Sequence, residues 1–287
     1  MSLSAPVRCS ALAQELDEPM AGSATQVTRW LLVEDRGLWG HDAVRDLMGS
    51  EATAAAKAAG MKLLLVRQRE GDPAADASRR VMLADASSGE MATRTVADLS
   101  QLSVAAVAAQ PVASFGDPLA GALFLVCTNG KRDACCALRG RVLMAAMAER
   151  HPDRTWESTH LGGHRFAGNL VCLPDGLLYG RVSPADGPRL ADAYLDGRLD
   201  PALLRGRASW PAPAQVAEAA VRERLGLLGV GDVGLVSASV DGYAAEVSLE
   251  AAGEEHLVRL RREASMPERI TSCRGEELDA PTHWVVA

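Results

Sequence analysis

The sequence has no long apolar segment. No stretch of the chain approaches the roughly 20 consecutive apolar residues that a transmembrane helix needs. The N-terminus also lacks the basic residues and the apolar run that together mark a secretory signal. We therefore expect a cytoplasmic protein that has no membrane partner.

Positive charge is scarce as well. The chain has 30 Lys and Arg residues against 37 Asp and Glu, which gives a formal net charge of −7, and only three of the basic residues are lysines. Without a basic field the chain does not attract the phosphates of nucleic acid, so we expect no nucleic-acid partner. Hydrophobic residues make up 48% of the chain, which is typical of a globular protein with a substantial core.

The chain lacks a Cys-x-x-Cys motif, although it clusters its cysteines. Three of the six lie in CTNGKRDACC, residues 127–136, and the segment HLGGH then places two of the six histidines four positions apart. In a reducing compartment, clustered cysteines are more often metal ligands or redox groups than disulfides. The first hypothesis is therefore a metal or iron–sulfur site.

The first part of the chain predicts a strand, a helix and a second strand. The runs RWLLVE (29–34) and MKLLLVR (61–67) are short and apolar, and segment 41–60 between them has helical composition and ends in glycine. This order is typical of an α/β fold. Residues 104–120 contain two prolines and a glycine near their end, which predicts a linker.

The middle of the chain predicts the element order of a thioredoxin-like domain. The expected elements are a strand at 121–127, a helix at 137–150, a strand at 154–159, a hairpin at 170–180 around Pro-Asp-Gly, and a helix at 186–200. In the first helix, Leu138, Val142 and Ala146, together with Leu143 and Met147, recur at helical spacing.

The last third predicts a small α+β module. WPAP at 210–213 marks its boundary, and residues 235–250 alternate around Asp241 and Gly242, which is a strong hairpin signal. We therefore predict an N-terminal α/β unit, a thioredoxin-like domain and a C-terminal α+β module, at residues 1–115, 116–209 and 210–287.

The candidate ligands are Cys127, Cys135, Cys136, His160 and His164. Thiolates and imidazoles suit zinc, copper(I) and iron–sulfur clusters. A zinc knuckle usually separates its cysteines by two to four residues, whereas the loop here is longer and is expected to wrap around a larger group such as a [2Fe-2S] cluster. We expect the N–H groups around residues 131–133 to face the sulfurs, and the start of the following helix to favour a thiolate at Cys136.

Three segments resemble the sucrase/ferredoxin-like family: CTNGKRDACC, HLGGHRFAGNLVCLPDGLLYGRV and CSALAQELDEPMAGSATQVTRWLLVEDRGLWG. The resemblance implies that the central domain is a thioredoxin-like [2Fe-2S] ferredoxin whose cluster is bound by two cysteines and two histidines. Its pattern carries over to Cys127, Cys136, His160 and His164, with Cys135 as the alternative to Cys136.

Three functions follow from these residues. The first is one-electron transfer or redox sensing with an unknown redox partner protein. The second is a binding or scaffold protein with a mononuclear structural zinc in the same ligands, and the third is a thiol oxidoreductase that uses Cys135 and Cys136. The family name suggests sucrose hydrolysis, but nothing in the sequence pairs two carboxylates in a site. We therefore favour an electron-transfer protein over a hydrolase.

The remaining candidates have ordinary interpretations. We expect Cys9, Cys172 and Cys273 to be small core residues, and His41, His151, His256 and His283 to be ordinary surface or core residues. Trp156 and Phe166 are expected to be packing residues. For Arg132, Arg165 and Arg181 two interpretations stay open, namely attraction of an acidic partner and weak solvated ion pairs.

Overall fold

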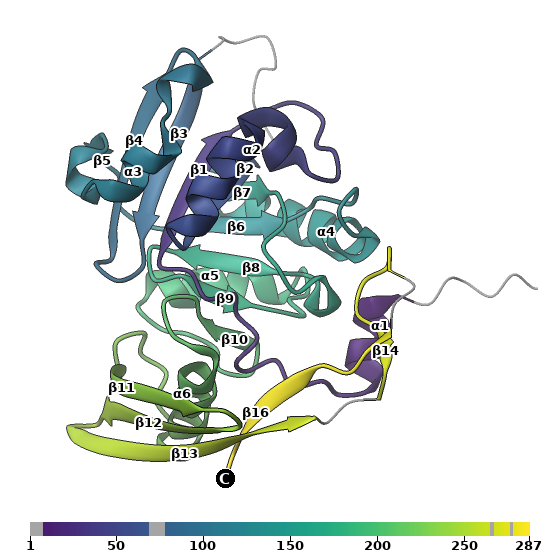
Figure 1. The fold of residues 1–287 in the computed structure, drawn as a ribbon, viewed down its shortest axis with the longest axis vertical. Coiled ribbons are helices and arrows are strands. Elements are labelled where there is room, and N and C mark those ends of the chain that lie inside the picture. The colour runs from purple at the N-terminus through teal and green to yellow at the C-terminus, as the bar shows by residue number, and fades with distance from the viewer. Residues whose placement is uncertain (1–7, 69–77, 265–266, 276–277) are drawn as a thin grey trace, which may run out of the picture.

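The computed structural model describes residues 8–68, 78–264, 267–275 and 278–287. Within these ranges the chain forms a ten-stranded mixed sheet, a four-stranded antiparallel sheet and a two-stranded pair. In Figure 1 the four-stranded sheet and its helix lie below the large sheet. The α/β fold predicted from the sequence is confirmed.

The large sheet has the strand order β10-β9-β8-β6-β7-β2-β1-β3-β4-β5. Its strands are β1 Arg29–Glu34, β2 Met61–Arg67, β3 Arg79–Asp85, β4 Glu90–Val96, β5 Asp117–Pro118, β6 Leu123–Cys127, β7 Thr155–Ser158, β8 Leu170–Leu173, β9 Leu177–Tyr179 and β10 Leu204–Arg207. The α-helices of the described ranges are α1 Cys9–Glu15, α2 Ala43–Ala58, α3 Val104–Ala109, α4 Ala134–Arg150, α5 Asp186–Leu195 and α6 Ala212–Leu225.

The predicted strand, helix and strand of the first unit are confirmed as β1, α2 and β2. β1 and β2 pair in parallel, and α2 connects them. The linker predicted at 104–120 is wrong, because α3, a 3₁₀ turn at Val112–Ser114 and β5 occupy it, and β5 pairs with β4. Val104 and Val107 are buried. The helical spacing of the apolar residues was therefore a better guide to the structure of this segment than its prolines were.

The predicted element order of the central unit is also observed. β6 pairs in parallel with β7 on one side and antiparallel with β8 on the other. β8 and β9 form the hairpin predicted around Pro-Asp-Gly. The three-unit division of the chain stays a prediction, and one continuous sheet crosses its first boundary at residues 115 and 116.

The apolar stripe predicted on α4 is only half buried. Leu143 and Met147 are buried, but Leu138 and Val142 are 58% and 52% exposed. The buried face instead runs through Cys136, Gly140, Leu143 and Met147. A cysteine and a glycine set the orientation of the helix, and neither residue stands out as a core residue in a hydrophobic pattern.

The C-terminal module consists of α6 and a four-stranded sheet. That sheet has the order β11-β12-β13-β16, with bounds Val233–Asp241, Ala244–Ala251, Glu254–Ala264 and Thr282–Val286. β11 and β12 form the hairpin predicted around Asp241 and Gly242. The short strands β14, Arg269–Ile270, and β15, Leu278–Asp279, form a separate pair.

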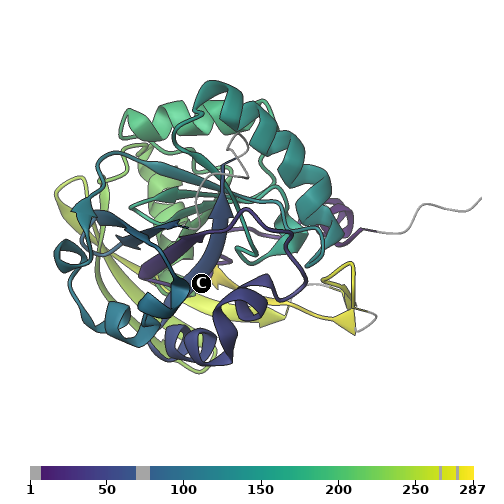
Figure 2. The same ribbon diagram turned by 90° about the horizontal axis from the view of Figure 1, so that it is seen from above.

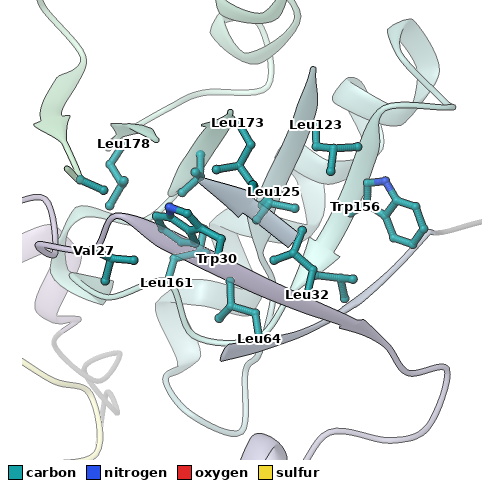
Figure 3. Packing of buried hydrophobic residues seen from close by; sticks show 14 of the residues in the cluster. Val27, Trp30, Leu32, Leu64, Leu123, Leu125, Trp156, Leu161, Leu173 and Leu178 are labelled. Atoms are coloured by element: carbon teal, nitrogen blue, oxygen red, sulfur yellow. The ribbon is translucent and has the colours of Figure 1, made fainter. Parts of the chain in front are cut away.

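The large sheet curls so that both of its halves share one core. Paired residues point to the same face, and the cluster in Figure 3 joins Trp30 and Leu32 of β1 to Leu125 of β6 and Leu173 of β8. Helices α2 and α3 cover the other face of the first half, and α4 and α5 cover that of the second. Figure 2 shows these helix pairs on opposite sides of the strands. Cys127 and Cys136 lie at the edge of the shared core.

The N-terminal helix α1 meets the segment around Cys273 beside the start of α4. In Figure 1 the purple helix α1 and the yellow strand β14 lie side by side, and the N–H of Cys9 donates to the sulfur of Cys273 at 3.5 Å. No helix in the described ranges combines the length and the apolar character needed to cross a bilayer.

Gly140 allows α4 to approach β6, which sets the position of the thiols. A Cβ added at Gly140 would lie 2.0 Å from the carbonyl oxygen of Cys127. We predict that Gly140→Ala lowers the free energy of unfolding by about 2 kcal/mol, although alanine favours a helix by about 1 kcal/mol. Urea denaturation measures this change.

Gly231→Ala is the matched control, because no heavy atom lies within 4 Å of a Cβ added at Gly231. Its free energy of unfolding should stay within about 0.5 kcal/mol of the wild-type value. A Gly140→Ala protein as stable as the wild type would contradict the argument from packing.

Candidate metal centre

The site is built around the first turn of α4. Cys127 is the last residue of β6, and Asp133 caps the helix, accepting a hydrogen bond at 2.8 Å from the N–H of Cys135. The loop between them is held by buried Asn129, whose side-chain amide donates to the carbonyl oxygen of Gly40 at 3.1 Å. The strand end, the loop and the helix start therefore form one ordered unit.

The sequence predicted that the N–H groups around residues 131–133 would face the sulfurs, but they do not. The N–H groups of Lys131 and Arg132 donate to the side-chain oxygen of Asn129, and that of Asp133 donates to its carbonyl oxygen. The backbone donor that does reach Cys127 is the N–H of Leu161. The prediction is wrong because an Asn side chain competes for nearby backbone donors.

A first thiol group contains Cys127, Cys136 and His160. Their ligand atoms all lie within 4.8 Å of one another. A hydrogen bond from the Cys136 thiol lowers the pKa of Cys127 well below its usual value despite full burial, and His160 acts in the same direction. The pKa of Cys136 is raised, because the thiol keeps its proton in this hydrogen bond. The group therefore contains a thiolate at Cys127 and a thiol at Cys136, and the negative charge of the thiolate favours binding of a cation.

His164 lies next to this group but outside it. Its ring centroid is 5.3 Å from that of His160, and its Nε2 is 3.9 Å from Oδ2 of Asp133. Burial lowers the pKa of His164, although the carboxylate of Asp133 opposes the shift. The Nδ1 atoms of His160 and His164 are both buried, and neither has a hydrogen-bond partner. An unpartnered buried imidazole nitrogen costs free energy unless another group binds it.

A second thiol group contains Cys9, Cys135, Cys273 and Asp133, whose ligand atoms also lie within 4.8 Å of one another. Cys9 and Cys273 were expected to be ordinary core residues, and the structure instead gathers them around Cys135. Hydrogen bonds from the Cys9 thiol and from the Ser10 hydroxyl lower the pKa of Cys135 to about 5. No local motif in the sequence marks Cys9 or Cys273, so this group could not have been found there.

The vicinal cysteines belong to different groups. Neighbouring residues on a helix point in directions about 100° apart, so Cys136 faces Cys127 while Cys135 faces Cys9. All six cysteines are free. Cys172 is buried in the core cluster beneath α4 and α5, as the sequence predicted. The other four histidines lie in neither thiol group among the described residues.

Arg205, which the sequence analysis missed, fixes the HLGGH loop. Its buried guanidinium donates to the carbonyl oxygen of Gly162 at 3.0 Å and to the side-chain oxygen of Asn169 at 2.9 Å. A Cβ added at Gly163 would lie 2.4 Å from the guanidinium. A Cβ added at Gly162 would instead lie 2.6 Å from Oγ1 of Thr25, so each of the two glycines allows a close approach to a different side chain. Burial lowers the pKa of Arg205 to about 9.

Two of the three arginines considered as partner sites bind the chain's own N-terminal segment. Arg165 pairs with the buried carboxylate of Glu18 at 2.8 Å, and Arg181 donates to the carbonyl oxygens of Ala13 and Glu18. Arg132 pairs with Asp42 at 2.8 Å on the surface. Trp156 and Phe166 are buried packing residues, as predicted.

Comparison with known proteins identifies the region that contains the first thiol group. Residues 20–206 match the sucrase/ferredoxin-like family. Altered inheritance of mitochondria protein 32 from Meyerozyma guilliermondii is 36% identical over 84 residues, which are 25% of this chain and 29% of that protein. The protein of the same name from Eremothecium gossypii is 34% identical over 110 residues, 33% of this chain and 35% of that protein.

Each match thus spans about a third of the relative's length. No solved structure matches the chain significantly. The matched family region includes Cys127, Cys136, His160 and His164 but ends well before Cys273 and begins after Cys9.

The buried guanidinium of Arg205 generates a prediction for the loop. Arg205→Met leaves the acceptors at Gly162 and Asn169 without a donor in the interior, which should lower the free energy of unfolding by about 3 kcal/mol. Arg141→Met is the control, because Arg141 is exposed on α4. Chemical denaturation of both variants should separate them, and equal stabilities would contradict the role of Arg205.

Proposed function

This chain belongs to the sucrase/ferredoxin-like family, and from that membership and the arrangement of its ligand atoms we propose that it is an electron-transfer or redox-sensing protein. It carries a [2Fe-2S] cluster whose ligands are Cys127, Cys136, His160 and His164. The bound cluster supplies one-electron chemistry, and its potential depends on its ligands, hydrogen bonds and burial.

The observation that carries the proposal is the pair of unpartnered imidazole nitrogens beside two buried thiols. Nδ1 of His160 and Nδ1 of His164 have no hydrogen-bond partner, and the Cys127 and Cys136 thiols are each 1% exposed. Two thiolates with two neutral imidazoles are a donor set for iron, and replacing two thiolates by imidazoles raises the reduction potential.

The surrounding residues prepare these ligands for a metal. Burial keeps His164 neutral at pH 7 by lowering its pKa, and a neutral ring has a lone pair to donate. The N–H of Leu161 and the thiol of Cys136 both stabilise a thiolate at Cys127. The ammonium of Lys62 and the guanidinium of Arg205 lie near Cys127, and their charges favour added negative charge there.

Cys136, rather than Cys135, is the second cysteine ligand in this proposal. Cys136 shares a group with Cys127 and His160, whereas the sulfur of Cys135 lies 3.6 Å from that of Cys9. The same geometry argues against a thiol oxidoreductase, because the vicinal thiols turn toward different neighbours. A mononuclear zinc remains the second candidate, since three ligand atoms within 4.8 Å also suit a single ion.

We also propose where a redox partner binds. A hollow beside His160 is lined by Arg45, Lys62 and Arg132, with Asp42 as the opposing charge. Electron transfer needs a partner to approach the cluster, and His160 is the ligand next to this hollow. An acidic patch on a partner protein would complement the three cations. The cytoplasmic location stays a proposal.

The test compares the visible spectrum and metal content of anaerobically purified full-length protein with those of three variants. The wild type should be reddish-brown with about two irons per chain. His164→Ala and Cys136→Ser should lose the colour and most of the iron. Cys135→Ser is the matched control for Cys136→Ser and should keep both.

Other outcomes identify the competing functions. A colourless wild type with one zinc that is lost in Cys136→Ser and His164→Ala would replace the cluster by a mononuclear site. Iron that is retained in Cys136→Ser but lost in Cys135→Ser would overturn the ligand assignment. No metal, even after anaerobic reconstitution, would reject both metal functions.

The lowered pKa of His164 predicts how the cluster responds to acid. The unfolded chain binds a proton at this ring near pH 6.5, whereas the native ring binds it only at lower pH. The native state therefore loses stability as the pH falls below about 6.5, and the protonated ring cannot bind iron. Visible absorbance should hold between pH 8 and 7 and disappear on further acidification. His164→Cys should move that loss to lower pH, and an unchanged midpoint would refute the role of the imidazole.

A further inference from the structure

The proposed cluster leaves three cysteines unused, and they meet at one point. Cys9 begins α1, Cys135 lies in the first turn of α4, and Cys273 belongs to the C-terminal segment. Their sulfur atoms are separated by 3.6 Å for Cys9 and Cys135, 3.2 Å for Cys135 and Cys273, and 3.5 Å for Cys273 and Cys9. Each thiol therefore contacts both of the others, although the three residues are far apart in the sequence.

These separations suit one small metal ion. Two thiolates bound to one tetrahedral zinc at about 2.3 Å lie roughly 3.8 Å from each other, and the sulfurs here are slightly closer than that. A disulfide requires about 2.05 Å, and all three cysteines are free. A third thiol would also remain unpaired if two of them were oxidised. A single metal ion, unlike a disulfide, can bind all three sulfurs at once.

The carboxylate of Asp133 is the fourth potential ligand in this group. Its carboxylate is fully buried, and its Oδ1 lies 3.9 Å from the sulfur of Cys9. Oδ1 accepts hydrogen bonds from the N–H of Cys135 and, at 3.9 Å, from the Cys9 thiol. The second bond is lost when Cys9 binds a metal as a thiolate, which leaves a lone pair of Oδ1 for the same metal. Oδ2 accepts hydrogen bonds from the N–H of Cys273 and the hydroxyl of Ser272, which orient the carboxylate.

We propose that Cys9, Cys135, Cys273 and Asp133 form a structural zinc site. Four protein ligands close the coordination shell of zinc, which is the arrangement of structural rather than catalytic sites. The carboxylate favours zinc over copper(I), because copper(I) prefers soft sulfur ligands. This site is separate from the proposed cluster, whose ligands are other residues.

The site would fasten α1 and the segment around Cys273 to α4. Cys9 and Cys273 lie outside residues 20–206, the region that matches the family, whereas Asp133 and Cys135 lie within it, so the site would link the flanking segments to that region. A second contact joins the same segments, because the buried carboxylate of Glu18 forms ion pairs with both Arg165 and Arg269. A bound zinc would hold these segments together beside His164, whose Nε2 is 3.9 Å from Oδ2 of Asp133.

The test measures iron and zinc together in the full-length protein, purified anaerobically without a metal-affinity tag. The wild type should contain about one zinc per chain in addition to its iron. Cys9→Ala and Cys273→Ala should each lower zinc at least tenfold and keep the iron. Cys172→Ala is the matched control, because Cys172 is a free core thiol in neither group, and it should keep both metals.

Cys127→Ala separates this proposal from the proposed function. It should lose iron and keep zinc, so failure of the cluster leaves the zinc result intact. X-ray absorption at the zinc edge should show three sulfur ligands near 2.3 Å and one oxygen near 2.0 Å.

Three results would overturn the zinc site. They are a wild type that holds iron but no zinc, zinc that stays stoichiometric in both Cys9→Ala and Cys273→Ala, and zinc that disappears only with Cys127→Ala. A mass two hydrogens lower in the wild type, without zinc, would assign the three thiols to disulfide formation instead.

Discussion

The arrangement of both thiol groups depends on one buried carboxylate. Asp133 caps α4 through Cys135, binds the N–H of Cys273, and lies beside the ring of His164. Burial alone would raise the pKa of this carboxyl, yet the N–H groups of Cys273 and Cys135 bring it below its usual value. A charge removed from water is costly unless hydrogen bonds replace the lost solvent. Here the helix start and the C-terminal segment supply those bonds, and in doing so they bring the cysteines together.

Two adjacent cysteines serve two separate groups because of simple helix geometry. Cys135 and Cys136 lie side by side in the sequence, but α4 turns one toward Cys9 and the other toward Cys127. Gly140, one turn further along, lets the helix approach β6 closely enough for the second contact. The orientation of α4 therefore determines which thiol joins which group.

Much of the fold could be predicted because its signals are local. Both hairpins, around Pro174-Asp175-Gly176 and Asp241-Gly242, follow from turn chemistry. The grouping of Cys127, Cys136 and His160 follows from a strand end, a helix start and a glycine-rich loop. Other features are set by tertiary contacts, which leave no periodic pattern. Leu138 and Val142 match a helical stripe yet are exposed, because Cys136 and Gly140 orient the helix.

The second thiol group and the role of Arg205 could not be predicted from the sequence, because they too depend on tertiary contacts. Cys9 and Cys273 are separated by 264 positions, and a single cysteine with no nearby partner reads as a core residue. Arg205 stands in a short strand, LRGR, where nothing local distinguishes a buried guanidinium from a surface one. Only the folded chain reveals that it binds the loop carrying both histidines.

The strand order also determines when during folding the ligands can meet. Cys127 and His160 come together only after β6 and β7 have paired in parallel, and β7 in turn pairs with β2 from the first unit. Such non-local parallel pairing is slow, because the entropy of closing long loops is lost before the contacts form. A metal bound by both residues would therefore need an assembled sheet, unlike the ion of a small zinc finger, around which the chain folds. The contact between Cys9 and Cys273 spans nearly the whole chain, so it closes a far longer loop than the pairing of β6 with β7 does.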